Sequence, residues 1–81
     1  MPVRDYSNRI EVNPRILLGK PVIRGTRIAV YVILDLIAER CTIEEILGYY
    51  PSLKQEDVIA ALQFGADAAK YREIELDEAT C

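Results

Sequence analysis

A strongly apolar segment from Ile28 to Ala38 constrains this sequence more than any other feature, because ten of its eleven residues are apolar. At about 100° per residue, Val30, Leu34 and Ile37 fall on one face of a helix and Asp35 falls on the opposite face. The spacing therefore predicts an amphipathic helix of about three turns. Since the chain has only 81 residues, we expect a single domain with one core.

Two more helices follow this segment. Thr42 and Glu45 have the spacing of a capping box and predict a helix that begins at Ile43. Pro51 ends it, because the residue before a proline avoids the α region. A third helix is expected from about Lys54 to about Tyr71, and the short turn before it makes the two helices cross as in a helix-turn-helix. The buried stripe predicted for the third helix consists of Val58, Ala61, Leu62, Gly65 and Ala69. Its residues are small enough for another helix to approach closely.

The residues before Ile28 have the pattern of short strands and turns. Residues 9–12 alternate polar and apolar, and Val22-Ile23 is a β-branched pair between two turn signals. A pair of strands is marginal in water, so these strands have to lie on the helices. The predicted fold is mainly α, with three helices and a short N-terminal β-hairpin or extended arm. The single domain, 1–81, divides into a basic arm or hairpin (1–27), a helical core (28–71) and an acidic tail (72–81) that is strand-capable or disordered.

Charge divides the chain into a basic front and an acidic back. Residues 1–27 carry six basic and two acidic groups, which gives a net charge of +4. Residues 28–81 carry four basic and eleven acidic groups, which gives −7, so the whole chain has a net charge of −3. Four of the basic residues lie between Arg15 and Arg27. Such a cluster is either a solvated surface or the footprint of a polyanion-binding site, and both interpretations stay open.

The composition argues against an enzyme and against a metal centre. The chain has no histidine, which removes Ser-His-Asp and Cys-His nucleophiles and every metal site that needs imidazole. Cys41 and Cys81 alone are too few for zinc, so we expect no metal, no cofactor and no catalytic residue. We also expect two free thiols in a reducing cytoplasm, with Cys41 buried as a small hydrophobic residue. The longest apolar run, Ile28 to Leu34, is far shorter than the roughly 20 residues that cross a bilayer.

The densest motif is KPVIRGTRI, residues 20–28. In a purely structural interpretation, Gly25 makes a tight turn and Thr26 caps the helix that follows. In a functional interpretation, Arg24 and Arg27 lie on either side of the glycine turn and hold a phosphate or a carboxylate with charge-assisted hydrogen bonds.

Three strings of the sequence, GKPVIRGTRI (19–28), IEEILGYYPSL (43–53) and EDVIAAL (56–62), resemble a widespread bacterial and archaeal family of short proteins with a domain of unknown function. The resemblance covers roughly residues 6–71. It implies a homeodomain-like fold with a helix-turn-helix core. Some members are similar to VapB-type antitoxins, which implies an antitoxin that neutralises a PIN-domain-like ribonuclease toxin and binds its own operator DNA.

The sequence departs from that family's pattern at three points. Ala29 stands where a proline usually opens the first helix, and Lys54 replaces the usual threonine cap of the third helix. Glu56 and Asp57 place two acids in the first turn of the third helix, where they repel phosphate, so we expect phosphate contacts chiefly from the arm. The residues expected to bind nucleic acid or toxin are Lys20, Arg24, Gly25, Thr26, Arg27, Lys54 and Gln55. Toxin neutralisation is expected to depend on Arg24 or Arg27 more than on the tail.

A homodimer is expected because two of the predicted helices carry a second apolar stripe. The stripe residues are Val32 and Leu36 on the first helix and Ala60, Phe64 and Tyr71 on the third. A second interpretation of function also stays open, a non-catalytic interaction or dimerisation module that binds no nucleic acid. Strong salt dependence of operator binding favours the antitoxin over this module.

Overall fold

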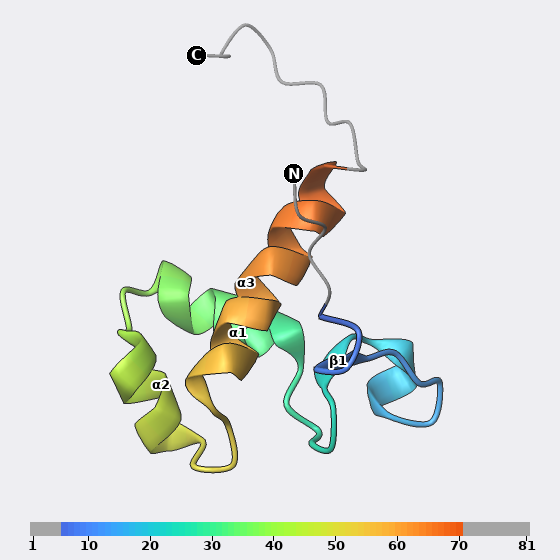
Figure 1. Cartoon of the computed structure of the whole chain (residues 1–81), viewed down its shortest axis with the longest axis horizontal. Coiled ribbons are helices and arrows are strands. Elements are labelled where there is room, and N and C mark those ends of the chain that lie inside the picture. The colour runs from blue at the N-terminus through green and yellow to red at the C-terminus, as the bar shows by residue number, and fades with distance from the viewer. Residues whose placement is uncertain (1–5, 71–81) are drawn as a thin grey trace, which may run out of the picture.

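The computed structural model describes residues 6–70. In chain order it contains β1 (Ile10–Glu11), a 3-10 turn (Leu17–Gly19), β2 (Val22–Ile23), α1 (Val30–Ala38), α2 (Ile43–Tyr49) and α3 (Gln55–Lys70). The long helix α3 crosses α1, while α2 lies on one side of this pair and the hairpin on the other (Figure 1). The predicted fold, three helices with a short N-terminal antiparallel hairpin, is confirmed.

The hairpin is tied directly to the start of α1. Ile10 pairs with Ile23 and Glu11 pairs with Val22 in antiparallel register. A further bridge joins Val22 to Ala29, and the Ile23 amide donates to the Ile28 carbonyl oxygen at 3.0 Å. Both residues of β2 are buried, so the strands lie on the helices, as expected for a pair that is marginal in water alone.

The helix α1 begins at Val30, and Val30 is buried as its sequence predicts, but the rest of its buried line differs from the prediction. Its N-cap is Ala29, which has extended backbone and no side-chain cap, so the expected capping by Thr26 is wrong. Ile33 is fully buried, whereas Leu34 and Ile37 on the predicted face are half-buried. The apolar run is broad enough to be covered on more than one side, and Val30 and Ile33 belong to the cluster that the hairpin, α2 and α3 share.

The helix α2 begins with the predicted capping box. The Glu45 amide donates to Thr42 Oγ1 at 3.1 Å, and the Thr42 amide donates to Glu45 Oε1 at 2.8 Å. These two bonds satisfy amides that the first turn of a helix leaves without partners. The helix ends at Tyr49, just before Pro51, as the proline predicts.

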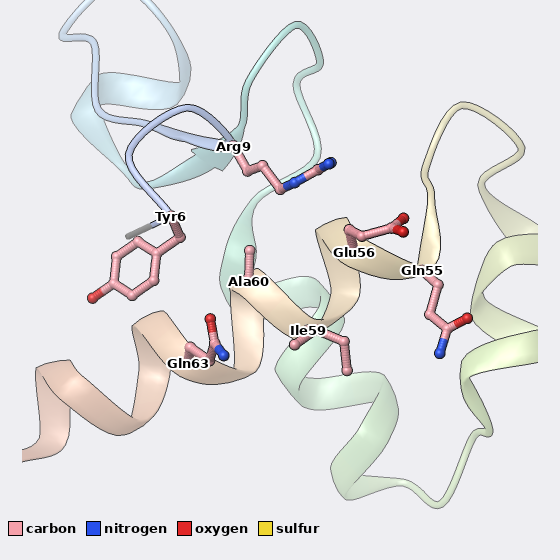
Figure 2. A pocket seen from close by; sticks show the side chains of 7 residues that line it. All are labelled: Tyr6, Arg9, Gln55, Glu56, Ile59, Ala60 and Gln63. Carbon is pink, nitrogen blue, oxygen red and sulfur yellow. The ribbon is translucent and has the colours of Figure 1, made fainter. Parts of the chain in front are cut away.

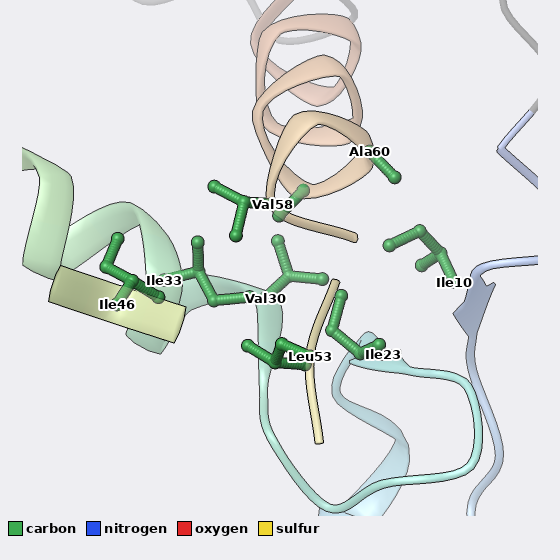
Figure 3. Packing of buried hydrophobic residues seen from close by; sticks show 9 residues of the cluster. Ile10, Ile23, Val30, Ile33, Ile46, Leu53, Val58 and Ala60 are labelled. Carbon is green, nitrogen blue, oxygen red and sulfur yellow. The ribbon is translucent and has the colours of Figure 1, made fainter. Parts of the chain in front are cut away.

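Side chains of both strands and of α1, α2 and α3 meet in one aliphatic core (Figure 3). Val58 and Ala61 of the predicted α3 stripe are fully buried, but Ala69 is exposed, because α3 extends beyond the elements that cover it (Figure 1). A Cβ added at Gly65 would lie 2.8 Å from Leu34 Cδ1, so the glycine permits the predicted close approach of α1 and α3. The core residues drawn with labels are Ile10, Ile23, Val30, Ile33, Ile46, Leu53, Val58 and Ala60.

The predicted tail, residues 72–81, and Tyr71 lie outside the described residues. Cys41, expected to be buried, is half-buried against the core, and its thiol is free. In the part of the chain from 6 to 70, no helix is both long and apolar enough to cross a membrane.

Candidate functional site

Three cationic side chains from distant parts of the sequence line one hollow beside the start of α3. The hollow has a volume of about 330 Å³, and we refer to it as the basic hollow. It contains Arg24 and Lys54, two of the residues expected to bind nucleic acid or toxin, which are 30 positions apart. The residues that line it are Asn8, Arg9, Arg24, Ser52, Lys54 and Asp57.

Asp57 anchors the arm to the first turn of α3. Its Oδ1 accepts from Arg9 Nη1 at 2.9 Å, and its Oδ2 accepts from the Lys54 amide at 2.9 Å. The residue is only 8% exposed. Asp57 is therefore not a free acid that repels phosphate, as the sequence predicted. It also supplies an acceptor for the Lys54 amide, the bond that the third helical residue makes in a capping box.

Arg24 holds the arm in place as well as lining the basic hollow. Its Nη2 donates to the carbonyl oxygens of Ser7 at 2.9 Å and Ile10 at 3.4 Å, and its amide donates to the Arg9 carbonyl oxygen at 2.8 Å. The two side-chain bonds use only Nη2, which is one of the three guanidinium nitrogens. Arg24 is nevertheless exposed, so the arginine can both brace the arm and meet a ligand.

Gly25 and Thr26 shape the turn between β2 and α1. Gly25 has φ +83°, a left-handed conformation that glycine adopts readily. The Thr26 amide and hydroxyl both donate to the Ile23 carbonyl oxygen, at 3.0 and 2.7 Å, and the hydroxyl accepts from the Ile28 amide at 3.0 Å. The turn positions Arg24 at the edge of the basic hollow.

A second hollow shares Arg9 with the basic hollow. Its volume is about 390 Å³, and Gln55, another residue predicted to bind nucleic acid or toxin, is among the residues that line it. Figure 2 shows Arg9 reaching from the arm toward the first turn of α3, with Tyr6 beside Gln63 further along the helix. The Tyr6 ring packs edge-to-face on Phe64 at 5.7 Å between centroids, and its hydroxyl donates to Asp67 Oδ2 at 2.9 Å. The lining residues are Tyr6, Arg9, Gln55, Glu56, Ile59, Ala60 and Gln63.

Lys20 lies apart from the basic hollow, at an apolar groove between α1 and α3. The groove has a volume of about 540 Å³, and Lys20 Nζ is 5.8 Å from the centre of the Tyr31 ring. Arg27 is exposed and lines neither this groove nor either hollow. The structure thus groups Arg24 with Lys54 in the basic hollow, while Gln55 lines the second hollow. Lys20 and Arg27 line neither of the two. The groove is lined by Lys20, Pro21, Val30, Tyr31, Leu34, Phe64, Gly65 and Ala68.

The residues predicted to form a dimer interface are largely used inside the domain. Ala60 is 3% exposed, and Phe64 packs on Tyr6. Val32 and Leu36 are half-buried, and Leu36 packs against the core. This burial leaves less of each stripe for a second copy than the sequence suggested, and the homodimer stays a prediction.

Sequence reasoning missed Arg9, Asn8, Ser52 and Asp57 as residues around a site. The Arg9 to Asp57 pair joins positions 48 apart, and no local spacing connects them. One signal was available, because an acid at the third position of a helix can reach back to the amide at its start. Within residues 6–70, no group of three acidic or cysteine side chains is placed to hold a metal ion.

Comparison with known proteins identifies the family. The model of the family described as "Protein of unknown function (DUF433)" matches residues 10–65. The crystal structure of a DUF433 member protein from Anabaena variabilis is similar, with 30% sequence identity and a TM-score of 0.74. The match covers 79% of this chain and 63% of that one, so this chain spans less than two thirds of that protein's length. No curated protein matches significantly. The chain belongs to the DUF433 family.

Proposed function

We propose that this protein is a non-catalytic, antitoxin-like regulator that binds the phosphate backbone of operator DNA at the basic hollow. The observation that supports this most is the grouping of Arg24 and Lys54 with Arg9 around one hollow. Three cations and one acid give its lining a net charge of +2. Phosphate contacts by arginine and lysine supply most of the affinity of proteins for DNA.

The pairing of Asp57 strengthens this proposal. An unpaired carboxylate at the start of α3 would repel a phosphate, but Arg9 and the Lys54 amide already bind both oxygens of Asp57. The side chains of Arg24 and Lys54 are exposed at the same hollow. A phosphate that approaches the hollow therefore meets two accessible cations beside a carboxylate that Arg9 neutralises.

The toxin half of the proposal rests on the resemblance to VapB-type antitoxins. A PIN-domain-like ribonuclease carries an acidic site, and the basic face of residues 6–27, with five cations and one acid, has the opposite charge. Because Arg24 braces the arm, Arg27 is the cleaner residue to test. Co-expression with a PIN-domain protein encoded beside this one should protect cells, and Arg27→Glu should reduce that protection more than Arg40→Glu. Equal protection by both variants would remove Arg27 from the toxin interface.

Lys54→Gln is the sharpest probe of DNA binding, because the hydrogen bond at that position comes from the backbone amide and survives the substitution. Binding is measured by fluorescence anisotropy with a duplex taken from upstream of the gene. Arg40→Gln is the matched control, since Arg40 lies beyond the far end of α1 from the hairpin. We expect Lys54→Gln to weaken binding several-fold and Arg40→Gln to leave it near wild type. Equal binding by wild type and Lys54→Gln would contradict the proposal.

A homodimerisation module without nucleic-acid binding is the second candidate. Exposed apolar side chains favour it, since Tyr31 is 54% exposed and Ile59 is 37% exposed. Sedimentation equilibrium at tens of micromolar distinguishes the two, together with the duplex assay. A stable dimer that binds no duplex at low salt supports the module.

A further inference from the structure

The apolar groove between α1 and α3 is the largest of the three hollows described, at about 540 Å³. Tyr31 and Leu34 of α1 form one side, and Phe64 and Ala68 of α3 form the other. Lys20 is the single charged residue among those that line it. The groove thus suits an apolar segment that brings acidic groups to its rim.

The segment that follows α3 has this chemistry. Residues 72–77 read REIELD, so Ile74 and Leu76 alternate with acids. In an extended conformation, alternate side chains point to opposite sides. Ile74 and Leu76 would then share one side, and the acids would occupy the other. Over residues 72–81 there are four acids and one arginine, a net charge of −3.

We propose that Ile74 and Leu76 fold back into the groove of the same chain and that the acids beside them meet Lys20 at its rim. The groove begins close to the origin of the segment, because Ala68 lies two positions before Lys70, the last residue of α3. From Lys70 back to Phe64 is six residues, or about 9 Å along a helix. About three extended residues span that distance, so a reversal at residues 71–73 lets Ile74 reach Ala68 and Leu76 reach Phe64.

Charge and proximity together select this occupant over a second copy of the domain. A segment tethered within about one helical turn of the groove has a high effective concentration there. Residues 6–27 of another copy are basic, with five cations and one acid, and they would meet Lys20 with the same sign of charge. Docking would cover Tyr31, which is 54% exposed in the described structure.

Paramagnetic relaxation in the full chain tests the proposal. A nitroxide is attached to Cys81 in a Cys41→Ala background, and amide signals are recorded by NMR. We expect the amide signals of Gly65 and Ala68 to be largely lost, because the docked segment brings the nitroxide close to them. The double variant Ile74→Ser/Leu76→Ser should restore these signals, because it removes the apolar pair. Ala79→Ser is the matched control, because it changes the same segment without removing the apolar pair, and it should leave the loss intact.

Three results would overturn the proposal. Full signal at Gly65 and Ala68 would mean that the segment does not reach the groove. Loss that persists in Ile74→Ser/Leu76→Ser would mean that the tether alone, and not the apolar pair, brings the label close. A loss of the Gly65 and Ala68 signals that needs the spin label on one molecule and the isotope label on another would assign the groove to the segment of a second copy. If the Cys41→Ala background fails to fold, amide shifts of Gly65 in the natural chain and the double serine variant give the same comparison without a label.

Discussion

Replacing Asp57 with alanine should destabilise the protein far more than the loss of an exposed acid. The carboxylate accepts one hydrogen bond from Arg9 and one from the Lys54 amide, each at 2.9 Å. Alanine removes both acceptors at once. The Lys54 amide then lacks its cap at the start of α3, and the arm loses its charged link to that helix.

The magnitude follows from how exposed each partner is. Loss of a side-chain cap at a helix start costs about 1 kcal/mol. The Arg9 side chain is 37% exposed, so water partly replaces the carboxylate, and the ion pair contributes roughly 0.5–1 kcal/mol. The sum is about 2 kcal/mol, which lowers Tm by about 8–16 °C in a domain of this size. Asp57→Asn keeps an oxygen for the amide and should cost about 1 kcal/mol.

Urea denaturation followed by far-UV circular dichroism measures these changes. Asp35→Ala is the matched control, because Asp35 is an exposed acid in the middle of α1, and it should stay within about 0.5 kcal/mol of wild type. A double-mutant cycle with Arg9→Gln isolates the ion pair. If Asp57→Ala and Asp35→Ala have the same midpoint, the link between arm and helix does not stabilise the fold.

Four further substitutions probe the backbone and the helix contacts. Gly48→Ala should raise the free energy of unfolding by up to about 1 kcal/mol, because a Cβ inside α2 would meet no atom within 4 Å; a lower thermal midpoint would contradict this. Gly25→Ala should lower the free energy of unfolding by about 1–2 kcal/mol, because φ at Gly25 is +83°, although a Cβ would meet no atom within 4 Å. An unchanged thermal midpoint would count against the left-handed turn. Gly65→Ala should lower the free energy of unfolding by about 1–3 kcal/mol, because its Cβ would lie 2.8 Å from Leu34 Cδ1. Leu34→Ala should then destabilise the Gly65→Ala protein less than it destabilises wild type, and equal losses in the two backgrounds would argue against the contact. Thr42→Ala should lower the free energy of unfolding by about 1 kcal/mol, because it removes the capping box. Urea denaturation measures this change, and a midpoint equal to that of wild type would mean that the capping box contributes nothing to stability.

Local patterns predicted the elements of this fold well. The spacing of Thr42 and Glu45 located the start of α2, and Pro51 located its end, because capping and proline sterics act over a few residues. Gly65 was expected at a close helix contact, and Leu34 lies there. The β-branched pair Val22-Ile23 was expected as a strand and is one.

Features that depend on distant residues could not be read from the sequence. The apolar run of α1 offers several candidate faces, and its neighbours decide that Ile33 is fully buried. Likewise, Ala60 and Phe64 looked like a surplus stripe until the arm covered that side of α3 with Tyr6. The candidate site depends on Arg9 and Asp57, which only the tertiary fold brings together.

The salt dependence of duplex binding tests the central claim most directly. Each phosphate contact that is lost should flatten the slope of log K against log salt concentration by about one. The account predicts a steep slope for wild type and a slope shallower by about two for Arg24→Gln/Lys54→Gln, with the fold of that variant checked by circular dichroism. A wild-type slope near zero, or the same slope in both proteins, would contradict phosphate binding at the basic hollow.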